Sequence, residues 1–201
     1  MSLRRWLAGL AAACLALTGC APSAPNPEAF QGAYLQTPYQ LPQATLTDTD
    51  GRPFELRTSP TAPVLVVFFG YTSCPDICLG VLTDVATALN RVDPEVREKV
   101  QVLFITVDPD RDTPEVMREY LDRIDPSFIG LTGPIDTIEA VAAPLGVAIE
   151  GRTEVPGGYD VTHSTQLIGV DAERLGRVVW VQGTPVGALR SDLTELVRQQ
   201  G

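Results

Sequence analysis

The chain has 201 residues, of which 44% are hydrophobic and 20% are charged, and its formal net charge is −10 at pH 7. This length and composition suit a globular protein with one sizeable core. The acidic balance repels nucleic acid and anionic lipid surfaces, so we exclude a nucleic-acid-binding function.

The first 20 residues, MSLRRWLAGLAAACLALTGC, have the pattern of a secretory leader, because two arginines precede a short apolar run. The run is well short of the roughly 20 apolar residues that a transmembrane helix needs. Its ending, LTGC, resembles a bacterial lipobox, which implies cleavage before Cys20 and lipid on that residue. We therefore predict a signal peptide over residues 1–19 and a lipid anchor at the extracytoplasmic face of a bacterial membrane. An ordinary cleaved signal and an uncleaved anchor are the alternatives.

Residues 20–43 contain several prolines and no apolar periodicity, which predicts a tether of partly polyproline character. The remaining residues, 44–201, form the predicted folded domain. Its apolar runs and turn signals predict alternating strands and helices. In chain order we expect a hairpin over residues 44–56 with a turn at Asp50-Gly51, a strand over 63–69, a helix over 78–92, a strand over 100–107, a helix over 113–124, a strand over 128–131, a helix over 134–145, strands over 161–170 and 177–181, and a helix over 184–199.

Several local signals define these elements. Residues 63–69, PVLVVFF, form an apolar run between proline and glycine, which is typical of a strand buried on both faces. Thr113 is placed to cap a helix that opens with Pro114, and Gly146 is placed to end one. The order of elements predicts an α/β protein with a thioredoxin-like fold, in which helices flank a central mixed β-sheet that has an N-terminal β-hairpin extension.

Two cysteines, Cys74 and Cys78, lie between the first buried strand and the following helix. Cys14 would leave with the leader and Cys20 would carry lipid, so these two remain as thiols. The helix N-terminus should stabilise a thiolate, so we expect both to be more acidic than an ordinary thiol. Their i, i+4 spacing places the Cα atoms about 6 Å apart, which suits a disulfide or two sulfurs on one metal. Buried structural cysteines or a permanent disulfide are the alternatives.

The chain contains one histidine, His163, which follows a glycine-bearing loop and begins the predicted strand over residues 161–170. In thioredoxin-like oxidoreductases this loop presents a cis-proline beside the cysteines. Here no proline lies between Pro156 and the strand. We therefore expect His163 to face the two thiols; a surface histidine or one satisfied within the core is the alternative.

Two thiolates and one imidazole form a soft ligand set of low coordination number. Copper(I) accepts two or three such ligands, and copper(II) can add water or a carboxylate. Structural zinc normally takes four protein ligands, so it would need a carboxylate such as Asp76, which is explained more simply as a charge at a helix N-terminus. We predict copper, as Cu(I), Cu(II) or both, bound by Cys74, Cys78 and His163.

These residues lie in motifs that together resemble the Sco/SenC family of copper chaperones for cytochrome c oxidase assembly. The resemblance spans about residues 41–196 and rests on FFGYT leading into CPDIC, on TVDPDRDTPE, on GLTG and on YDVTHS. It implies a membrane-tethered thioredoxin-like domain that passes copper to the binuclear copper site of oxidase subunit II. We also expect a periplasmic copper donor and a monomeric protein. Leu79 departs from the proline that often follows the second cysteine in this family.

A metallochaperone delivers its cargo without turnover, so the main interpretation is a binding protein. The alternative is an enzyme, a thiol–disulfide reductase that keeps the oxidase copper-site cysteines reduced before metallation. The copper site needs His163, and the reductase does not. A thiol peroxidase fits poorly because no activating arginine pattern surrounds Cys74, and a copper or redox sensor would need a signalling partner. The acidic segment 108–115 is interpreted as a strand end and helix cap, with acids available to a docking surface.

Overall fold

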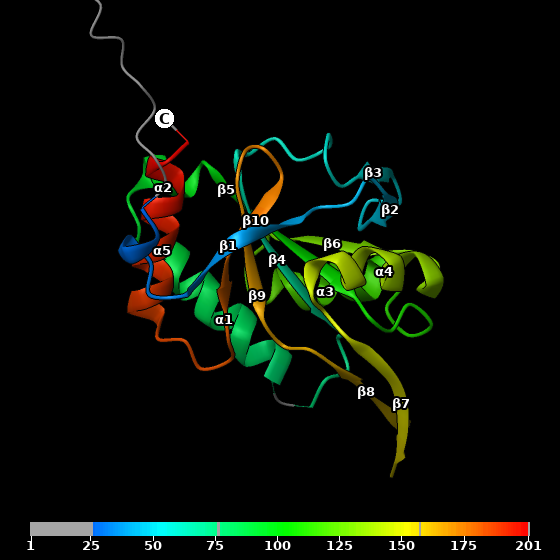
Figure 1. Cartoon of the computed structure of the whole chain (residues 1–201). Helices are drawn as coiled ribbons and strands as arrows, with labels where there is room; N and C mark the ends of the chain where they lie inside the picture. The colour runs from blue at the N-terminus through cyan, green and yellow to red at the C-terminus, as the bar shows by residue number, and fades with distance from the viewer. Residues whose placement is uncertain (1–25, 76, 157, 201) are drawn as a thin grey trace, which may run out of the picture.

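The computed structural model describes residues 26–75, 77–156 and 158–200, which form two β-sheets and the helices around them (Figure 1). The strands are β1 (Ala33–Gln40), β2 (Thr45–Asp48), β3 (Pro53–Glu55), β4 (Val64–Gly70), β5 (Val100–Thr106), β6 (Ile129–Thr132), β7 (Ile149–Val155), β8 (Gly158–His163), β9 (Leu167–Val170) and β10 (Leu175–Trp180). The helices are α1 (Ile77–Leu89), α2 (Pro94–Arg97), α3 (Pro114–Asp122), α4 (Ile135–Ala142) and α5 (Val186–Arg198), with short 3-10 turns η1 (Pro27–Ala29) and η2 (Ala143–Leu145).

The larger sheet has eight strands in the order β1-β10-β9-β4-β5-β6-β2-β3. Its centre is parallel, because β4, β5 and β6 run in the same direction. Antiparallel strands extend it on both sides, with β9, β10 and β1 beyond β4 and the β2–β3 hairpin beyond β6. Helices α1 and α5 pack together on one face, and α3 and α4 lie on the other (Figure 1). This architecture confirms the predicted α/β fold and its N-terminal hairpin.

The parallel strands form the centre of the core because their side chains are apolar on both faces. All seven residues of β4 and the last five of β5 are buried. Phe68 in β4 lies beside Phe104 in β5, with ring centroids 6.3 Å apart. Burying a side chain of this size contributes about 1.5 to 3 kcal/mol. The core therefore fixes the carboxyl ends of β4 and β5, where the candidate site lies.

Two helix boundaries follow the local signals in the sequence. Thr113 caps α3 by accepting a hydrogen bond from the Val116 amide at 3.3 Å, and Pro114 opens the helix. Gly146 follows η2 with a φ of 68°, in the left-handed region that favours glycine at a helix end. Both predictions are confirmed, although the last turn before Gly146 is 3-10 rather than α.

The folded domain begins earlier than the predicted end of the tether at residue 43. Residues 33–40 form the edge strand β1, which pairs antiparallel with β10. The buried carboxylate of Asp192 in α5 holds the start of this strand, because it accepts hydrogen bonds from the Gln31 and Gly32 amides at 2.9 and 2.8 Å. The prediction of a tether is wrong for residues 33–40, because the prolines were interpreted as a sign of a tether, whereas an edge strand also tolerates proline. Pro38 falls where the register of β1 against β10 shifts.

The predicted signal peptide and Cys20 lie outside the described residues. Among the residues that are described, no helix is both long and apolar enough to cross a bilayer.

The stretch predicted as one strand over residues 161–170 is two strands in different sheets. β8 ends at His163, and β9 begins at Leu167 after the chain has crossed to the larger sheet. Ser164 fixes the crossing, because it exchanges two hydrogen bonds of 2.9 and 3.0 Å with Ala148. His163 therefore ends a strand of the smaller sheet instead of beginning a core strand.

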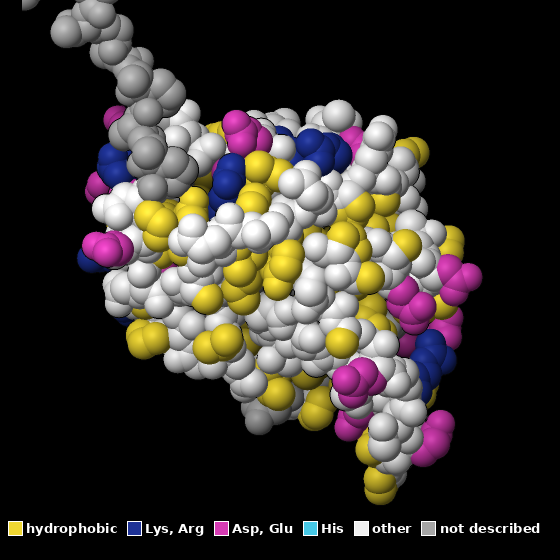
Figure 2. Space-filling model, in the orientation of Figure 1, with side chains coloured by type: hydrophobic (Ala, Val, Ile, Leu, Met, Phe, Trp, Pro, Cys, Tyr) yellow, Lys and Arg dark blue, Asp and Glu magenta, His cyan; other side chains and the backbone are white. Residues whose placement is uncertain are grey.

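The smaller sheet is an antiparallel hairpin of β7 and β8 that projects from the body of the molecule (Figure 1). We did not predict β7, because its sequence IEGRTEV is mostly exposed and lacks apolar alternation. Glu150 and Glu154 are exposed on it, and acidic side chains are visible along the projection in Figure 2.

Candidate metal site

The two cysteines lie where β4 leads into α1. Cys74 is in the connecting loop and is partly exposed, whereas Cys78 is in the first turn of α1 and is fully buried. Both are thiols, and the Cys78 amide donates a hydrogen bond to Cys74 Sγ at 3.4 Å. This contact satisfies one of the N–H groups that the start of a helix leaves unpaired. The structure thus brings the two sulfurs together at the strand-to-helix junction.

Gly70, the last residue of β4, makes room for the buried sulfur. A Cβ atom at this position would lie 3.1 Å from Cys78 Sγ and 3.0 Å from the Phe104 ring. Contacts this short would force the neighbouring atoms to move, so glycine lets the first turn of α1 pack directly on the sheet. Cys78 is thereby fixed against the core.

The pKa of Cys78 is raised above its ordinary value, first by its hydrogen bond with Cys74 and then by burial. Burial acts in this direction because the charged thiolate loses water. The nearby carboxylate of Asp112 raises this pKa further. The prediction that both cysteines are more acidic than an ordinary thiol is therefore wrong for Cys78, where the hydrogen bond with Cys74 and burial outweigh the helix N-terminus.

His163 reaches the cysteines from the smaller sheet. Its Nε2 atom lies 3.9 Å from Cys78 Sγ, and its Nδ1 atom lies 2.7 Å from the carbonyl oxygen of Ser164. A carbonyl oxygen only accepts, so Nδ1 carries the proton of the neutral ring and Nε2 presents its lone pair to the sulfur. Metal-binding histidines are commonly oriented by such a hydrogen bond on their second nitrogen. The Tyr71 ring packs edge-on against the imidazole, with centroids 5.9 Å apart.

The separation of sulfur and nitrogen is close to what a shared metal ion requires. Bonds of about 2.0 Å to nitrogen and 2.3 Å to sulfur place two ligands of one ion about 3.5 to 3.8 Å apart. Within the described ranges, no three His, Cys, Asp or Glu side chains already have the arrangement of a metal site. Binding of one metal by Cys74, Cys78 and His163 would therefore require these side chains to rearrange. Asp76, the weighed carboxylate ligand for zinc, lies outside the described residues.

An open hollow of about 310 Å³ gives access to this site from the surface. Its walls come from the cysteine loop and from β8, and they include Tyr71, Cys74, Pro75, Asp160 and His163. The partly exposed Cys74 thus lies in the hollow with the imidazole. A partner molecule can approach both side chains without any opening of the fold.

A buried carboxylate holds the cysteine loop in place. Asp112 is fully buried and accepts hydrogen bonds from the amide and hydroxyl of Thr72, at 3.0 and 2.6 Å. It also accepts the hydroxyl of Thr106, the last residue of β5, at 2.6 Å. The pKa of Asp112 is raised because the effect of burial outweighs these hydrogen bonds. Since Thr72 lies two residues before Cys74, Asp112 ties the cysteine loop to the end of β5.

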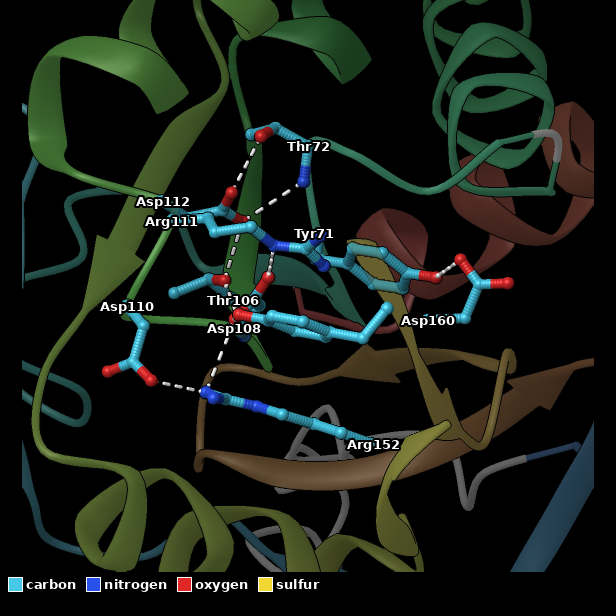
Figure 3. A network of polar contacts seen from close by, with 10 residues as sticks. Tyr71, Thr72, Thr106, Asp108, Asp110, Arg111, Asp112, Arg152 and Asp160 are labelled. Atoms are coloured by element: carbon cyan, nitrogen blue, oxygen red, sulfur yellow. Dashed lines mark hydrogen bonds and ion pairs between the residues drawn. The ribbon is translucent and has the colours of Figure 1, made fainter. Parts of the chain in front are cut away.

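A second buried carboxylate, Asp108, holds the hairpin that carries His163 (Figure 3). Its Oδ1 atom accepts the Tyr159 hydroxyl at 2.8 Å, and its Oδ2 atom pairs with Arg111. Arg152 of β7 lies 3.5 Å from Asp108 and pairs with Asp110 at 2.5 Å. Both guanidinium groups lie over the Tyr159 ring, that of Arg111 at 3.8 Å and that of Arg152 at 4.5 Å from its centroid. We call Asp108, Arg111, Arg152 and Tyr159 the aspartate clamp.

The acidic segment 108–115 differs in part from its prediction. The strand end and the helix cap are confirmed, but Asp108 and Asp112 face inward and are 0% exposed, so neither is available to a docking surface. Asp110 does reach solvent, with 67% of its side chain exposed. Sequence reasoning missed the role of Arg152 and Tyr159 because it missed the hairpin; the motif YDVTHS was the one signal that included Tyr159.

Tyr120 of α3 lies behind the cysteines, and no sequence motif pointed to it. Its side chain is 8% exposed and its ring centroid is 5.9 Å from that of Phe104. Among the described residues its hydroxyl has no hydrogen-bond partner. Burial raises the pKa of Tyr120, and the charges of Cys78 and Cys74 add to the effect. This phenol is therefore a buried donor close to the dithiol.

Comparison with known proteins relates this chain to a family. The sequence matches the family described as SCO1/SenC over residues 32–198. It is 35% identical over 130 residues to the mitochondrial protein SCO2 of Saccharomyces cerevisiae, a match that covers 64% of this chain and 43% of the yeast protein. The chain thus spans less than half of the length of that relative.

Solved structures of Sco proteins share the fold. Arabidopsis thaliana ScoI with copper bound has a TM-score of 0.71 at 28% identity, over 79% of this chain and 98% of that one. The solution structure of apo Sco1 from Thermus thermophilus has a TM-score of 0.69 at 31% identity, over 84% and 95% of the two chains. From the family match, the fold and these relatives, we conclude that the chain belongs to the SCO1/SenC family.

Proposed function

We propose that this protein is an extracytoplasmic copper metallochaperone, which binds copper as cargo through Cys74, Cys78 and His163. The observation that carries the proposal is the placement of His163: its Nε2 atom, with the ring proton held on Nδ1, faces Cys78 Sγ at 3.9 Å. Among the described strands, the hairpin that ends at His163 does not pair with the larger sheet, yet it brings the imidazole to the Cys78 thiol, as a three-ligand metal site requires.

The donor set favours copper over zinc. Two sulfurs and one nitrogen suit copper(I), whereas structural zinc normally takes four protein ligands. The Arabidopsis relative with the same fold was solved with copper bound. The hollow in front of Cys74 leaves an open side, through which a second protein can supply ligands and take the metal.

For the acceptor, we propose the binuclear copper site of cytochrome c oxidase subunit II, as the family resemblance implies. The leader over residues 1–19 would direct export and be removed, and a lipidated Cys20 would then hold the domain at the outer face of a bacterial membrane. A periplasmic donor would load the protein, which we propose acts as a monomer. The copper-binding domain then comprises the β1 strand together with residues 44–201.

Copper transfer to an apo subunit II fragment tests this function. Copper(I)-loaded protein is mixed with the fragment, and metal content and thiol state of both partners are followed together after separation. We expect copper to move to the fragment while Cys74 and Cys78 remain reduced, and we expect His163→Ala to carry little copper into the reaction. Retention of copper by the loaded wild type would contradict the proposed delivery.

The difference in exposure between the two cysteines favours one second candidate, a thiol–disulfide reductase. The Cys74 thiolate would attack a disulfide of the oxidase subunit and form a mixed disulfide, releasing one partner thiolate. Cys78 would then attack Cys74 Sγ, so that the partner leaves with two thiols and this protein holds a Cys74–Cys78 disulfide. Reduction of an oxidised subunit II fragment by metal-free protein, at the same rate in His163→Ala, would identify this activity.

A further inference from the structure

The hairpin that carries His163 takes its orientation from contacts outside its own sheet. β7 and β8 pair with each other, and among the described strands neither pairs with the eight-stranded sheet. A two-stranded hairpin is at best marginally stable by itself in water. The position of the imidazole must therefore come from the surfaces that the hairpin touches.

One attachment lies at the base of the hairpin, close to His163. Ser164 and Ala148 exchange two hydrogen bonds there, and Val161 is buried against the core. Beside it, the Tyr71 hydroxyl lies 3.4 Å from an oxygen of Asp160 (Figure 3). These contacts fix where the hairpin leaves the body but leave its outer part unsupported.

The aspartate clamp attaches the outer part of the hairpin to the body of the protein. It holds Tyr159 of β8 by a hydrogen bond to Asp108 and by two guanidinium groups over the ring. It also contacts β7, because Arg152 lies 3.5 Å from Asp108 and over the Tyr159 ring. Tyr159 precedes His163 by four residues, about 13 Å along a strand. The clamp therefore sets the direction of the strand from which the imidazole extends.

We propose that Asp108 is the positioning residue for His163, because its buried carboxylate orients the β7–β8 hairpin so that the imidazole meets the thiols. The proposal rests on the copper-binding function above. Asp108 acts through Tyr159 and the hairpin, and it is not a ligand.

The chemistry of the clamp requires a carboxylate at this position. The two oxygens of Asp108 serve different donors, the Tyr159 hydroxyl and the Arg111 guanidinium. An asparagine offers one acceptor oxygen, and its amide NH₂ group would face a donor at the other. Asp110 provides a matched control for Asp108. It pairs with the same Arg152, but at the surface, where ion pairs contribute little to stability.

The two buried aspartates divide the site between them. Asp112 binds Thr72 and so holds the cysteine loop, whereas Asp108 binds Tyr159 and so holds the histidine hairpin. Both belong to the turn that follows β5, whose backbone is closed by a 3.0 Å hydrogen bond from the Asp112 amide to the Asp108 carbonyl. This one turn therefore sets the position of the thiols relative to the imidazole.

A double-mutant cycle on copper binding tests the proposal. Copper(I) affinity is measured on the purified protein by competition with a chromophoric chelator, for wild type, Asp108→Asn, His163→Ala and the double variant. We expect Asp108→Asn alone to weaken binding about 10- to 100-fold, the loss typical for a partner that orients a metal ligand. In the His163→Ala background the same change should alter affinity by no more than about twofold, the usual limit for independent sites. The control Asp110→Asn should stay within that limit.

A spectroscopic readout distinguishes a displaced histidine from a general loss of structure. In copper(II)-loaded Asp108→Asn, the nitrogen coupling of the imidazole in electron paramagnetic resonance should weaken, while the sulfur-to-copper charge-transfer band should persist. Tyr159→Leu removes the clamp from the side of the hairpin and should give the same spectrum. If Asp108→Asn fails to fold, Tyr159→Leu takes its place in the double-mutant cycle.

Amide hydrogen exchange in the metal-free protein tests the positioning of the hairpin without copper. The β8 amides should exchange faster in Asp108→Asn and in Tyr159→Leu, while the α1 amides should keep their protection. If His163→Ala leaves copper affinity unchanged, the three-ligand function fails, and β8 exchange alone decides whether Asp108 positions the hairpin. The proposal is overturned if His163→Ala weakens copper binding and Asp108→Asn does not, or if Asp108→Asn causes equal losses in both backgrounds.

Discussion

The cysteine loop and the histidine hairpin contribute to the same site but are supported differently. The loop follows β4, in which every residue is buried, and it leads into α1, whose first turn packs on the sheet at Gly70. The hairpin consists of β7, in which six of seven residues are exposed, and β8. One half of the site is part of the core, whereas the other is attached to the core by the buried side chain of Val161 and by polar contacts.

This difference separates the consequences of changing each region. A change in the cysteine loop should affect every thiol-dependent property, because both metal binding and disulfide exchange use Cys74 and Cys78. A change in the hairpin should affect metal binding alone. The following predictions test this separation.

The largest effect is expected from Cys74→Ser or Cys78→Ser. Each removes a sulfur ligand, so copper(I) affinity should fall by at least about a thousandfold, well beyond the loss from disturbing a ligand's orienting partner. Complete reduction of a model disulfide should also stop, before the first step in Cys74→Ser and at the mixed disulfide in Cys78→Ser. Ser73→Ala, in the same loop, is the matched control and should retain both properties. A serine variant that kept tight copper binding would show that the loop is not the metal site.

The second-largest loss of copper affinity is expected from His163→Ala. Copper(I) affinity should fall by about 100-fold or more, since the loss of a ligand exceeds the loss of its orienting partner. Consumption of a model disulfide by the reduced protein should be unchanged. Chelator competition and a thiol assay on the same sample measure the two properties. Parallel losses in both assays would remove the proposed distinction between loop and hairpin.

A smaller, graded effect is expected from pH. Because the pKa of Cys78 is raised in the folded protein, its thiol stays protonated through neutral pH, and copper must displace that proton. Apparent copper affinity should therefore rise with pH, by about tenfold per unit for each proton released. Titration of released protons in weakly buffered solution checks the stoichiometry.

The stability of the metal-free protein should change with pH in the opposite direction to the copper affinity. Its folded form holds the Cys78 proton more tightly than the unfolded chain does, so the unfolding free energy should be insensitive to this thiol at low pH. It should fall as pH rises above the ordinary thiol pKa of about 8.5. Denaturant titrations of wild type and Cys78→Ser measure this, and an equal decline in both would assign the trend to other groups.

The smallest effect is expected from Tyr120→Phe. The buried hydroxyl has no hydrogen-bond partner within the described part of the chain, so its removal should leave the unfolding free energy unchanged or raise it by about 1 kcal/mol. Denaturant unfolding of the metal-free protein measures the change. A clear destabilisation would mean that the hydroxyl has a partner in solution, such as a bound water.

Much of the fold could be predicted because its elements carry strong local signals. The apolar run of β4, the Thr113 cap and the Gly146 stop depend on neighbouring residues alone. β1 and β7 could not be predicted in this way. β1 is an edge strand held by Asp192 from the far end of the chain, and β7 is a polar strand whose only strand partner, among those described, is β8.

The meeting of Cys78 and His163 could be predicted because the expected fold places the loop that carries the one histidine opposite the strand-to-helix junction that carries the cysteines. The contacts that hold the cysteine loop and the hairpin in place could not be predicted. The roles of Asp108 and Asp112 depend on burial and on partners such as Tyr159 and Thr72, which are distant in sequence. The pKa of Cys78 was predicted in the wrong direction because helix position is visible in a sequence, whereas the hydrogen bond with Cys74 and the burial of the sulfur are not.

X-ray absorption spectroscopy of the copper(I)-loaded protein tests the central claim most directly. The account predicts two sulfur ligands and one nitrogen ligand in the wild type, and loss of the nitrogen in His163→Ala with both sulfurs retained. A wild-type spectrum with sulfur ligands alone, or a nitrogen ligand that persists in His163→Ala, would contradict the claim that the core loop and the hairpin bind copper together.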